Sequence, residues 1–186
     1  MMKKIFLLLL VLQAFTGLAQ ESYRFEKSIN AFNLLVFKTI DISLERFIDQ
    51  ESSWGIAALI SLDDKSRVNG DNPYYNETIA LTPFYRLYFG SGEIAGFFVE
   101  GFGNLSFGHK NDWSYDDFCY GCDYVYNSSY HTKSFTSLNL GISLGRKWVT
   151  KKDVSFSVYA GIGRALLTDN GPSFFPRLGI LLGKRK

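Results

Sequence analysis

The sequence of 186 residues contains only two cysteines, two histidines and four prolines. With only two histidines, the chain has few candidates for the general base of a hydrolytic site. Lysine and arginine outnumber aspartate and glutamate by 20 to 18, and this near-neutral balance predicts no nucleic-acid partner. No run of about 20 apolar residues occurs, so no membrane-spanning helix is expected.

The first residues have the pattern of an export signal. Two lysines precede an apolar core over 5–12, and small residues stand three and one positions before an expected cut after Ala19. This core is too short to span a membrane as a helix, and no cysteine is available at the cut for a lipid anchor. The sequence predicts a signal peptide over 1–19, a polar lead over 20–27 and one domain over 28–186.

Glycine and aromatic residues are abundant and favour β-structure, with 17 glycines, 17 phenylalanines and 11 tyrosines. The segment 77–108 contains two runs with the two-residue period of strands, separated by a short turn at 91–93. Alternate positions from Ile79 to Phe89 are apolar. Both runs exceed the roughly 9 to 11 residues that a tilted strand needs to cross a membrane.

Similar runs recur along the chain. The expected strands are 28–37, 40–48, 54–62, the two runs of 77–108, 134–147, 154–166 and 174–183. The connections after the second, fourth and sixth strands have about 3 to 6 residues, and those after the third and fifth about 14 and 25, as in outer-membrane barrels. Only the short link after the first strand departs from this pattern. The predicted fold is an all-β, eight-stranded, antiparallel up-and-down transmembrane barrel.

The two faces of the expected strands differ in kind. One face is apolar, whereas the other is mostly glycine, serine, asparagine and alanine, with lysines only in loops or at strand ends. Small side chains suit the narrow interior of an eight-stranded barrel, so we expect the apolar faces to meet lipid. The alternative is a soluble periplasmic barrel, similar to a lipocalin, that binds an apolar ligand in its interior.

Five charged residues fall on the face that is expected to point inward. They are Asp41, Glu45, Arg86, Glu100 and Arg177. Charges inside a barrel must pair or meet water. We therefore predict that the two arginines neutralise the two glutamates and plug the lumen. The alternative is that some of these side chains reach an end of the barrel and are solvated.

Aromatic residues and prolines mark particular positions in the expected strands. Five aromatic residues lie near strand ends, where outer-membrane barrels carry aromatic girdles: Trp54, Tyr88, Phe89, Trp148 and Tyr159. Parity points Tyr88 and Tyr159 inward, which leaves plain packing as the alternative for these two. Pro83 and Pro176 lie inside expected strands, where each removes a ladder hydrogen bond, and a local bulge is expected at each.

Both cysteines lie in the segment 109–133, the longest expected loop. Cys119 and Cys122 form a C-Y-G-C pair, for which a local disulfide is expected in an oxidising compartment. A redox motif would need a βαβ setting. A zinc site with His109 and His131 and two free thiols remain open, although the spacings are irregular for zinc. No metal and no cofactor are predicted.

An enzyme that modifies lipid at the barrel rim is a further alternative. Its nucleophile would need one of the two histidines as a base, and the polar residues near His109 are typical of a solvated loop. These residues are Asp112, Ser114, Asp116 and Asp117. We therefore predict that the protein is not an enzyme.

With its eight expected strands, the chain resembles small outer-membrane barrels of the OmpA, OmpX and OmpW type, and three short motifs most resemble those of a family of short Gram-negative barrels. They are N-L-L at 33–35, I-S-L-E-R at 42–46 and P-F-Y-R-L-Y-F at 83–89. The resemblance covers roughly 28–183 and implies a barrel in the outer membrane, without catalytic residues. It leads to the expectation of a structural or surface-interaction role, with outer-membrane lipid around the barrel. Protein or glycan contact is expected through 63–76 and 109–133.

Overall fold

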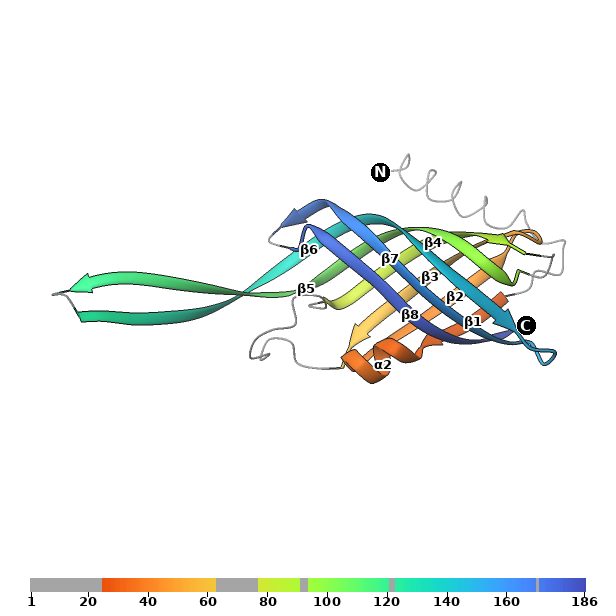
Figure 1. Cartoon of the computed structure of the whole chain (residues 1–186), viewed down its shortest axis with the longest axis horizontal. Helices are drawn as coiled ribbons and strands as arrows, with labels where there is room; N and C mark the ends of the chain where they lie inside the picture. The colour runs from red at the N-terminus through yellow and green to blue at the C-terminus, as the bar shows by residue number, and fades with distance from the viewer. Residues whose placement is uncertain (1–24, 63–76, 91–93, 121–122, 170) are drawn as a thin grey trace, which may run out of the picture.

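The chain forms a closed barrel of eight antiparallel strands in a computed structural model, in which each strand pairs with its neighbours in sequence and β8 pairs with β1 (Figure 1). The structure describes residues 25–62, 77–90, 94–120, 123–169 and 171–186, with the backbone alone in the parts of 110–132 that it includes. The expectation of an all-β, eight-stranded up-and-down barrel is confirmed. The predicted signal peptide over 1–19 lies outside the described residues.

The elements follow one another along the chain. They are β1 (Phe25–Asn30), α2 (Ala31–Phe37), β2 (Thr39–Phe47), β3 (Ser52–Ser61), β4 (Glu77–Phe89), β5 (Gly96–Tyr120), β6 (Asp123–Val149), β7 (Val154–Asp169) and β8 (Phe174–Arg185). β2, β4 and β6 end, and β3, β5 and β7 begin, at one end of the barrel, which we call the turn end. The chain enters β1 and leaves β8 at this same end, where the Phe25 amide donates to the Lys186 carbonyl over 3.0 Å. We call the opposite end the loop end.

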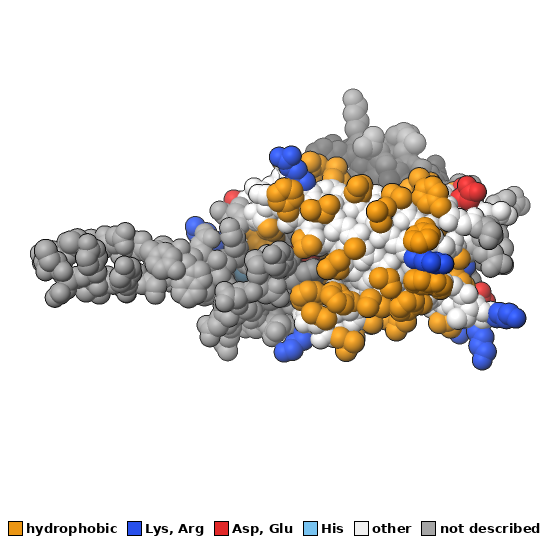
Figure 2. All heavy atoms as spheres, in the orientation of Figure 1, with side chains coloured by type: hydrophobic (Ala, Val, Ile, Leu, Met, Phe, Trp, Pro, Cys, Tyr) orange, Lys and Arg blue, Asp and Glu red, His pale blue; other side chains and the backbone are white. Residues whose placement is uncertain are grey.

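Side chains alternate between the outside and the inside of the barrel along most of each strand. On β6, Ile142 is 63% exposed and Leu144 is 62% exposed, whereas Ser143 between them is 1% exposed. The same alternation leaves apolar side chains over much of the outer surface (Figure 2). The predicted assignment of faces is therefore confirmed for these strands: the apolar face points outward and the small or polar face points inward.

The first expected strand, 28–37, is wrong at both ends. β1 begins at Phe25, inside the expected polar lead, and ends at Asn30, after which the chain turns into the helix α2. The Asn30 side chain caps this helix by accepting a hydrogen bond from the Asn33 amide over 3.3 Å, and Lys38 ends it in the left-handed conformation at φ 52°. The helix forms the connection to β2 at the loop end, so the short link expected after the first strand does not exist.

The expected loop 109–133 is also wrong, because β5 and β6 continue through it as a paired ribbon. Their register runs without a break from Gly96 opposite Lys147 to Tyr120 opposite Asp123. The ribbon projects well beyond the barrel (Figure 1). Its tyrosines and other aromatic residues favour strands, and this preference prevails over the aspartate, asparagine and serine that suggested a loop. The expected loop 63–76 lies outside the described residues.

The bulges expected at the two prolines are absent, since the strand register is unchanged on either side of each. Pairing of β4 with β5 skips Pro83 and resumes in the same register, so the lost ladder bond does not displace the strands. Pro176 pairs in register with Ile162 of β7, and on its other side β1 reaches only as far as Leu181. A proline at a position with no strand on one side costs few ladder hydrogen bonds.

Candidate functional site

The interior of the barrel contains the largest concentration of charged side chains in the described structure. All five residues predicted to point inward do so, with exposed fractions between 0% for Glu45 and 6% for Asp41 and Arg177. Period-2 alternation places them on the inner wall, since each lies an even number of residues from a buried neighbour on its strand.

Arg86 joins the two glutamates of this set. Its Nη1 lies 2.8 Å from Glu45 Oε2, and its Nε lies 2.7 Å from Glu100 Oε2. Arg177 approaches Glu100 from the other side of the lumen, with Nε 2.9 Å from Oε1. The Ser143 hydroxyl also donates to Glu100 Oε1, over 2.8 Å. The carboxylates are therefore held by charge-assisted hydrogen bonds in which both oxygens take part.

Three further charged residues complete the cluster at its turn end and were not predicted to lie there. Lys147 Nζ lies 2.7 Å from Glu45 Oε2 and 3.0 Å from Glu26 Oε1, and Arg185 Nε lies 3.1 Å from Glu26 Oε2. The contact of Lys147 with Glu26 is an ion pair of poor hydrogen-bond alignment, because Glu26 Oε1 has no hydrogen-bond partner among the described residues. Lys147 lies near the end of β6, as expected of the lysines, but its side chain turns into the lumen and is 1% exposed.

Strand boundaries explain why these residues were missed. Glu26 lay in the expected lead, and Arg185 lay beyond the end of the last expected strand. Lys147 stood at an expected strand end, where a long side chain can reach water. It nevertheless shares the parity of Ser143, which is buried. Extending the first and last expected strands by two residues would have found Glu26 and Arg185, and parity with Ser143 would have found Lys147.

Glu45 is the most highly coordinated carboxylate of the cluster. Its Oε1 accepts hydrogen bonds from the Ser53 hydroxyl over 2.6 Å and from the Tyr88 hydroxyl over 2.5 Å, while its Oε2 accepts from Arg86 and Lys147. Two cations neutralise this charge and two hydroxyl groups donate hydrogen bonds to it, so its full burial is tolerable. Tyr88 therefore serves the interior and is not part of a girdle.

Aromatic rings fill the space between the ionic groups. The Arg86 guanidinium carbon lies 4.4 Å from the Phe84 ring centroid and 4.8 Å from that of Phe98. Four of the inward aromatic rings each lie across a glycine that is the direct partner of the aromatic residue on the next strand, and a Cβ there would overlap the ring. The pairs are Phe84 with Gly55, Phe98 with Gly145, Phe102 with Gly141, and Tyr159 with Gly179.

Asp41 has different partners from the other predicted residues. Its Oδ2 accepts hydrogen bonds from the Asn30 amide over 2.9 Å and from the Asn33 amide over 2.8 Å. Asn30 Oδ1 also accepts from the Ile180 backbone amide over 3.2 Å, at the point where β1 leaves the sheet. Asp41 therefore anchors α2 and the end of β1 to the barrel wall. The prediction had grouped it with the ionic plug, but the hydrogen bonds of its carboxylate are to Asn30 and Asn33.

The five predicted girdle residues separate into two groups. Trp54, Phe89 and Trp148 point outward and are 43% to 62% exposed, whereas Tyr88 and Tyr159 are 4% exposed and lie inside. The structure therefore shows interior packing for Tyr88 and Tyr159, which was the alternative to a girdle role.

Most side chains of the segment 109–133, for which a disulfide or a zinc site was considered, lie outside the described residues. Cys119 lies in the ribbon opposite Tyr124, and Cys122 lies outside the described residues, as does the expected disulfide. The side chain of His131 is likewise not described. His109 Nδ1 lies 3.4 Å from the Thr78 hydroxyl oxygen. Among the described residues, no group of three or more metal-ligating side chains is found.

Within the described ranges, no helix is both long and apolar enough to cross a membrane. The comparisons with other proteins add no relationship. No protein family matches the chain, and neither a characterised protein nor a solved structure matches it.

Proposed function

We propose that the protein is an outer-membrane β-barrel without enzymatic activity, with a structural or surface-interaction role. The observation that carries this proposal is the outer surface of the barrel, where the outward positions of successive strands are exposed and apolar. Exposed apolar patches on soluble monomers rarely exceed a few hundred Å². A continuous apolar surface of this kind is compatible with contact to the hydrocarbon chains of lipids.

The dimensions and connections support the same proposal. β4 has 13 residues and β7 has 16, which exceed the roughly 9 to 11 residues that a tilted strand needs to cross a bilayer. Short connections at the turn end and longer segments at the loop end, here 31–38, 62–76 and the β5–β6 ribbon, are typical of bacterial barrels, whose turn end faces the periplasm. The likeness to small barrels of the OmpA, OmpX and OmpW type is consistent with this orientation.

The interior favours a closed barrel over a ligand-binding one. A soluble barrel that binds an apolar ligand would present apolar side chains around a central cavity. Here the middle of the barrel is occupied by Arg86, Glu100 and Arg177 together with aromatic rings. An ionic cluster of this kind is a poor site for an apolar molecule and an obstacle to solutes.

The surface role is proposed for the segments at the loop end. The ribbon of β5 and β6 projects beyond the barrel, and its sequence is rich in tyrosine and aspartate. Together with 63–76, it would stand outside the membrane and contact protein or glycan.

Trypsin treatment of intact cells, combined with membrane fractionation, tests location and orientation together. We expect the protein in the outer-membrane fraction and cleavage after Lys133, which is exposed at the base of the ribbon. Lys151 and Lys152 in the β6–β7 connection should be cleaved only after the outer membrane is permeabilised. Recovery in the soluble periplasmic fraction would contradict the proposal and favour the soluble barrel.

A further inference from the structure

The outward positions of the strands at the turn end carry charges of one sign only. Among the described strand residues at this end, the charged side chains outside the barrel wall are Lys27, Arg46, Arg146 and Lys184, which we call the basic rim. The acidic residues of the same strand ends, Glu26 and Glu45, point inward. Alternation along the strands thus leaves only cations on the outside of this end, whereas the carboxylates lie inside together with the cations that pair with them.

Two of these cations face each other without a carboxylate between them. Lys27 of β1 pairs directly with Lys184 of β8, and both are exposed on the outer face. Among the described residues, neither lysine has a carboxylate partner. Like charges directly opposite on neighbouring strands destabilise a sheet. An anion bound between the two ammonium groups would remove this repulsion.

The basic rim directly adjoins the apolar surface. The next outward pair along the same two strands is Ile29 opposite Leu182, and both side chains are exposed. A ligand that contacts the rim from the side of the barrel therefore meets apolar side chains a few ångströms further along each strand. The surface fits a molecule with an anionic head and an apolar tail.

Aromatic rings accompany the two arginines of the rim. The Arg146 guanidinium carbon lies 4.8 Å from the Phe97 ring centroid and 5.2 Å from that of Trp148, and the Arg46 guanidinium carbon lies 5.6 Å from that of Phe25. Aromatic and basic side chains of this kind gather where hydrocarbon gives way to lipid headgroups. The arginines therefore lie at the level at which phosphate groups occur.

We propose that the basic rim binds the phosphate groups of anionic phospholipids, with Lys27 and Lys184 as its principal binding pair. This inference rests on the proposed membrane location and specifies the lipid that the turn end selects. Phosphate accepts hydrogen bonds from both ammonium groups, while the acyl chains pack on Ile29 and Leu182. Each lysine near an anionic lipid surface is expected to strengthen binding by about fivefold.

The two tryptophans of the barrel allow a direct test, because both lie beside the rim. Trp148 contacts Arg146, and Trp54 pairs with Arg46. The mature chain carrying Trp113→Phe in the ribbon is reconstituted into phosphatidylcholine bilayers that contain brominated phosphatidylglycerol or, at the same fraction, brominated phosphatidylcholine. Bromine quenches tryptophan fluorescence at contact. We expect several-fold stronger association of the anionic lipid, and loss of most of this preference in Lys27→Gln with Lys184→Gln.

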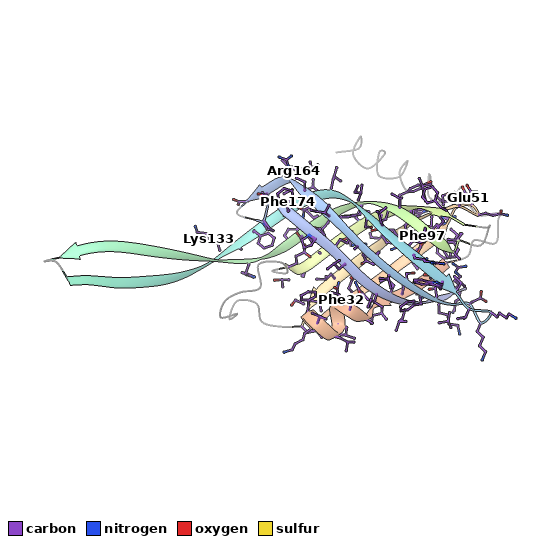
Figure 3. The ribbon with its side chains drawn as sticks, in the orientation of Figure 1. Phe32, Glu51, Phe97, Lys133, Arg164 and Phe174 are labelled. Atoms are coloured by element: carbon purple, nitrogen blue, oxygen red, sulfur yellow. The ribbon has the colours of Figure 1, made fainter. Side chains whose placement is uncertain are left out.

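A matched control removes two charges from the opposite end. Lys133 and Arg164 lie at the loop end, whereas Phe97 marks the turn end (Figure 3). Lys133→Gln with Arg164→Gln should retain the preference. The rim variant should fold at least as well as the parent, because it removes a repulsion, and Lys27→Gln alone provides a milder version.

The outcomes separate the two proposals. Equal quenching by both lipids in the parent, or a preference that survives Lys27→Gln with Lys184→Gln, overturns the rim and leaves the membrane assignment standing. No quenching by either lipid overturns both.

Discussion

Glu45 and Lys147 lie on opposite walls of the barrel, on strands that are four neighbours apart in either direction around the sheet, and their side chains meet at 2.7 Å. Arg86 adds a second tie to Glu45 from β4. The lumen is therefore crossed by ion pairs whose partners are distant in sequence. Such ties fix the cross-section of the barrel and occupy the path that a solute would take.

Removal of Lys147 should be strongly destabilising. Lys147→Met leaves Glu45 and Glu26 buried with one cation fewer, and loss of one partner from a buried pair costs about 3–5 kcal/mol. Denaturant unfolding of the reconstituted barrel measures the cost. The neighbouring Arg146→Met is the control, because Arg146 points outward and surface substitutions usually change stability by less than about 0.5 kcal/mol. Equal losses in the two variants would contradict a buried ionic role.

The wild-type barrel should not conduct ions. In planar bilayers we expect no channel openings above leakage, since charged and aromatic side chains fill the lumen. A triple variant with Glu45→Ala, Arg86→Ala and Lys147→Ala removes the ion pairs of Glu45 that cross the lumen. It keeps the interior nearly balanced in charge and should produce measurable conductance. Openings in the wild type, with no increase in the triple variant, would show that the cluster does not block the lumen.

Gly145 should not tolerate a side chain, although Gly101 on the neighbouring strand should. A Cβ at Gly145 would overlap the Phe98 ring and the Val158 carbonyl, whereas a Cβ at Gly101 meets nothing within 4 Å. Overpacking of this kind costs about 1–3 kcal/mol. Unfolding midpoints of Gly145→Ala and Gly101→Ala give the comparison. Similar midpoints for the two variants would argue against the close packing of rings on glycines.

The β2–β3 connection should show a pH dependence of its own. The Ser52 hydroxyl donates to Asp49 Oδ2 over 2.7 Å and the Glu51 amide to Oδ1 over 2.8 Å, and these bonds hold the pKa of Asp49 below its ordinary value of 3.8. The stabilisation that this carboxylate provides is present above that value and is lost as the pH falls through the lowered pKa.

Ser52→Ala should move the pKa of Asp49 back toward 3.8, because the hydroxyl is the principal cause of the shift. Carboxyl chemical shifts followed by nuclear magnetic resonance during a titration measure this pKa in both forms. An unchanged pKa in Ser52→Ala would show that the hydroxyl does not stabilise the carboxylate.

Parity along the strands accounts for the part of the interior that sequence predicts. Glu45 follows Leu44 and Glu100 follows Val99 in runs whose alternate positions are mostly apolar, so the two-residue period fixes their side of the wall. Lys147 and Glu26 lie near strand ends, where the period gives no boundary. A lysine there is equally compatible with water and with the lumen, so only the closed barrel shows that opposing walls bring these charges together.

Two other departures have local causes. The apolar run after Asn30 has no two-residue period, and sequence alone does not distinguish a short helix from a strand in such a run. The helix depends on the Asn30 cap and on the bonds from Asn30 and Asn33 to Asp41, which join residues 8 to 11 positions apart. In the ribbon, aromatic strand formers alternate with turn formers, and the pairing of β5 with β6 prevails.

The proposed membrane location requires hydrocarbon to lie against the outer face, and spin labels along β6 test this directly. Single cysteines at Leu138, Leu140, Ile142 and Leu144, in a chain whose native cysteines are replaced by serine, carry the label in reconstituted bilayers, with Lys151 as a site in water. Labels at the four leucine and isoleucine positions should collide with oxygen and be shielded from a water-soluble nickel chelate, whereas the label at Lys151 should collide with the chelate. Free access of the nickel chelate to all four outward positions would contradict the membrane assignment.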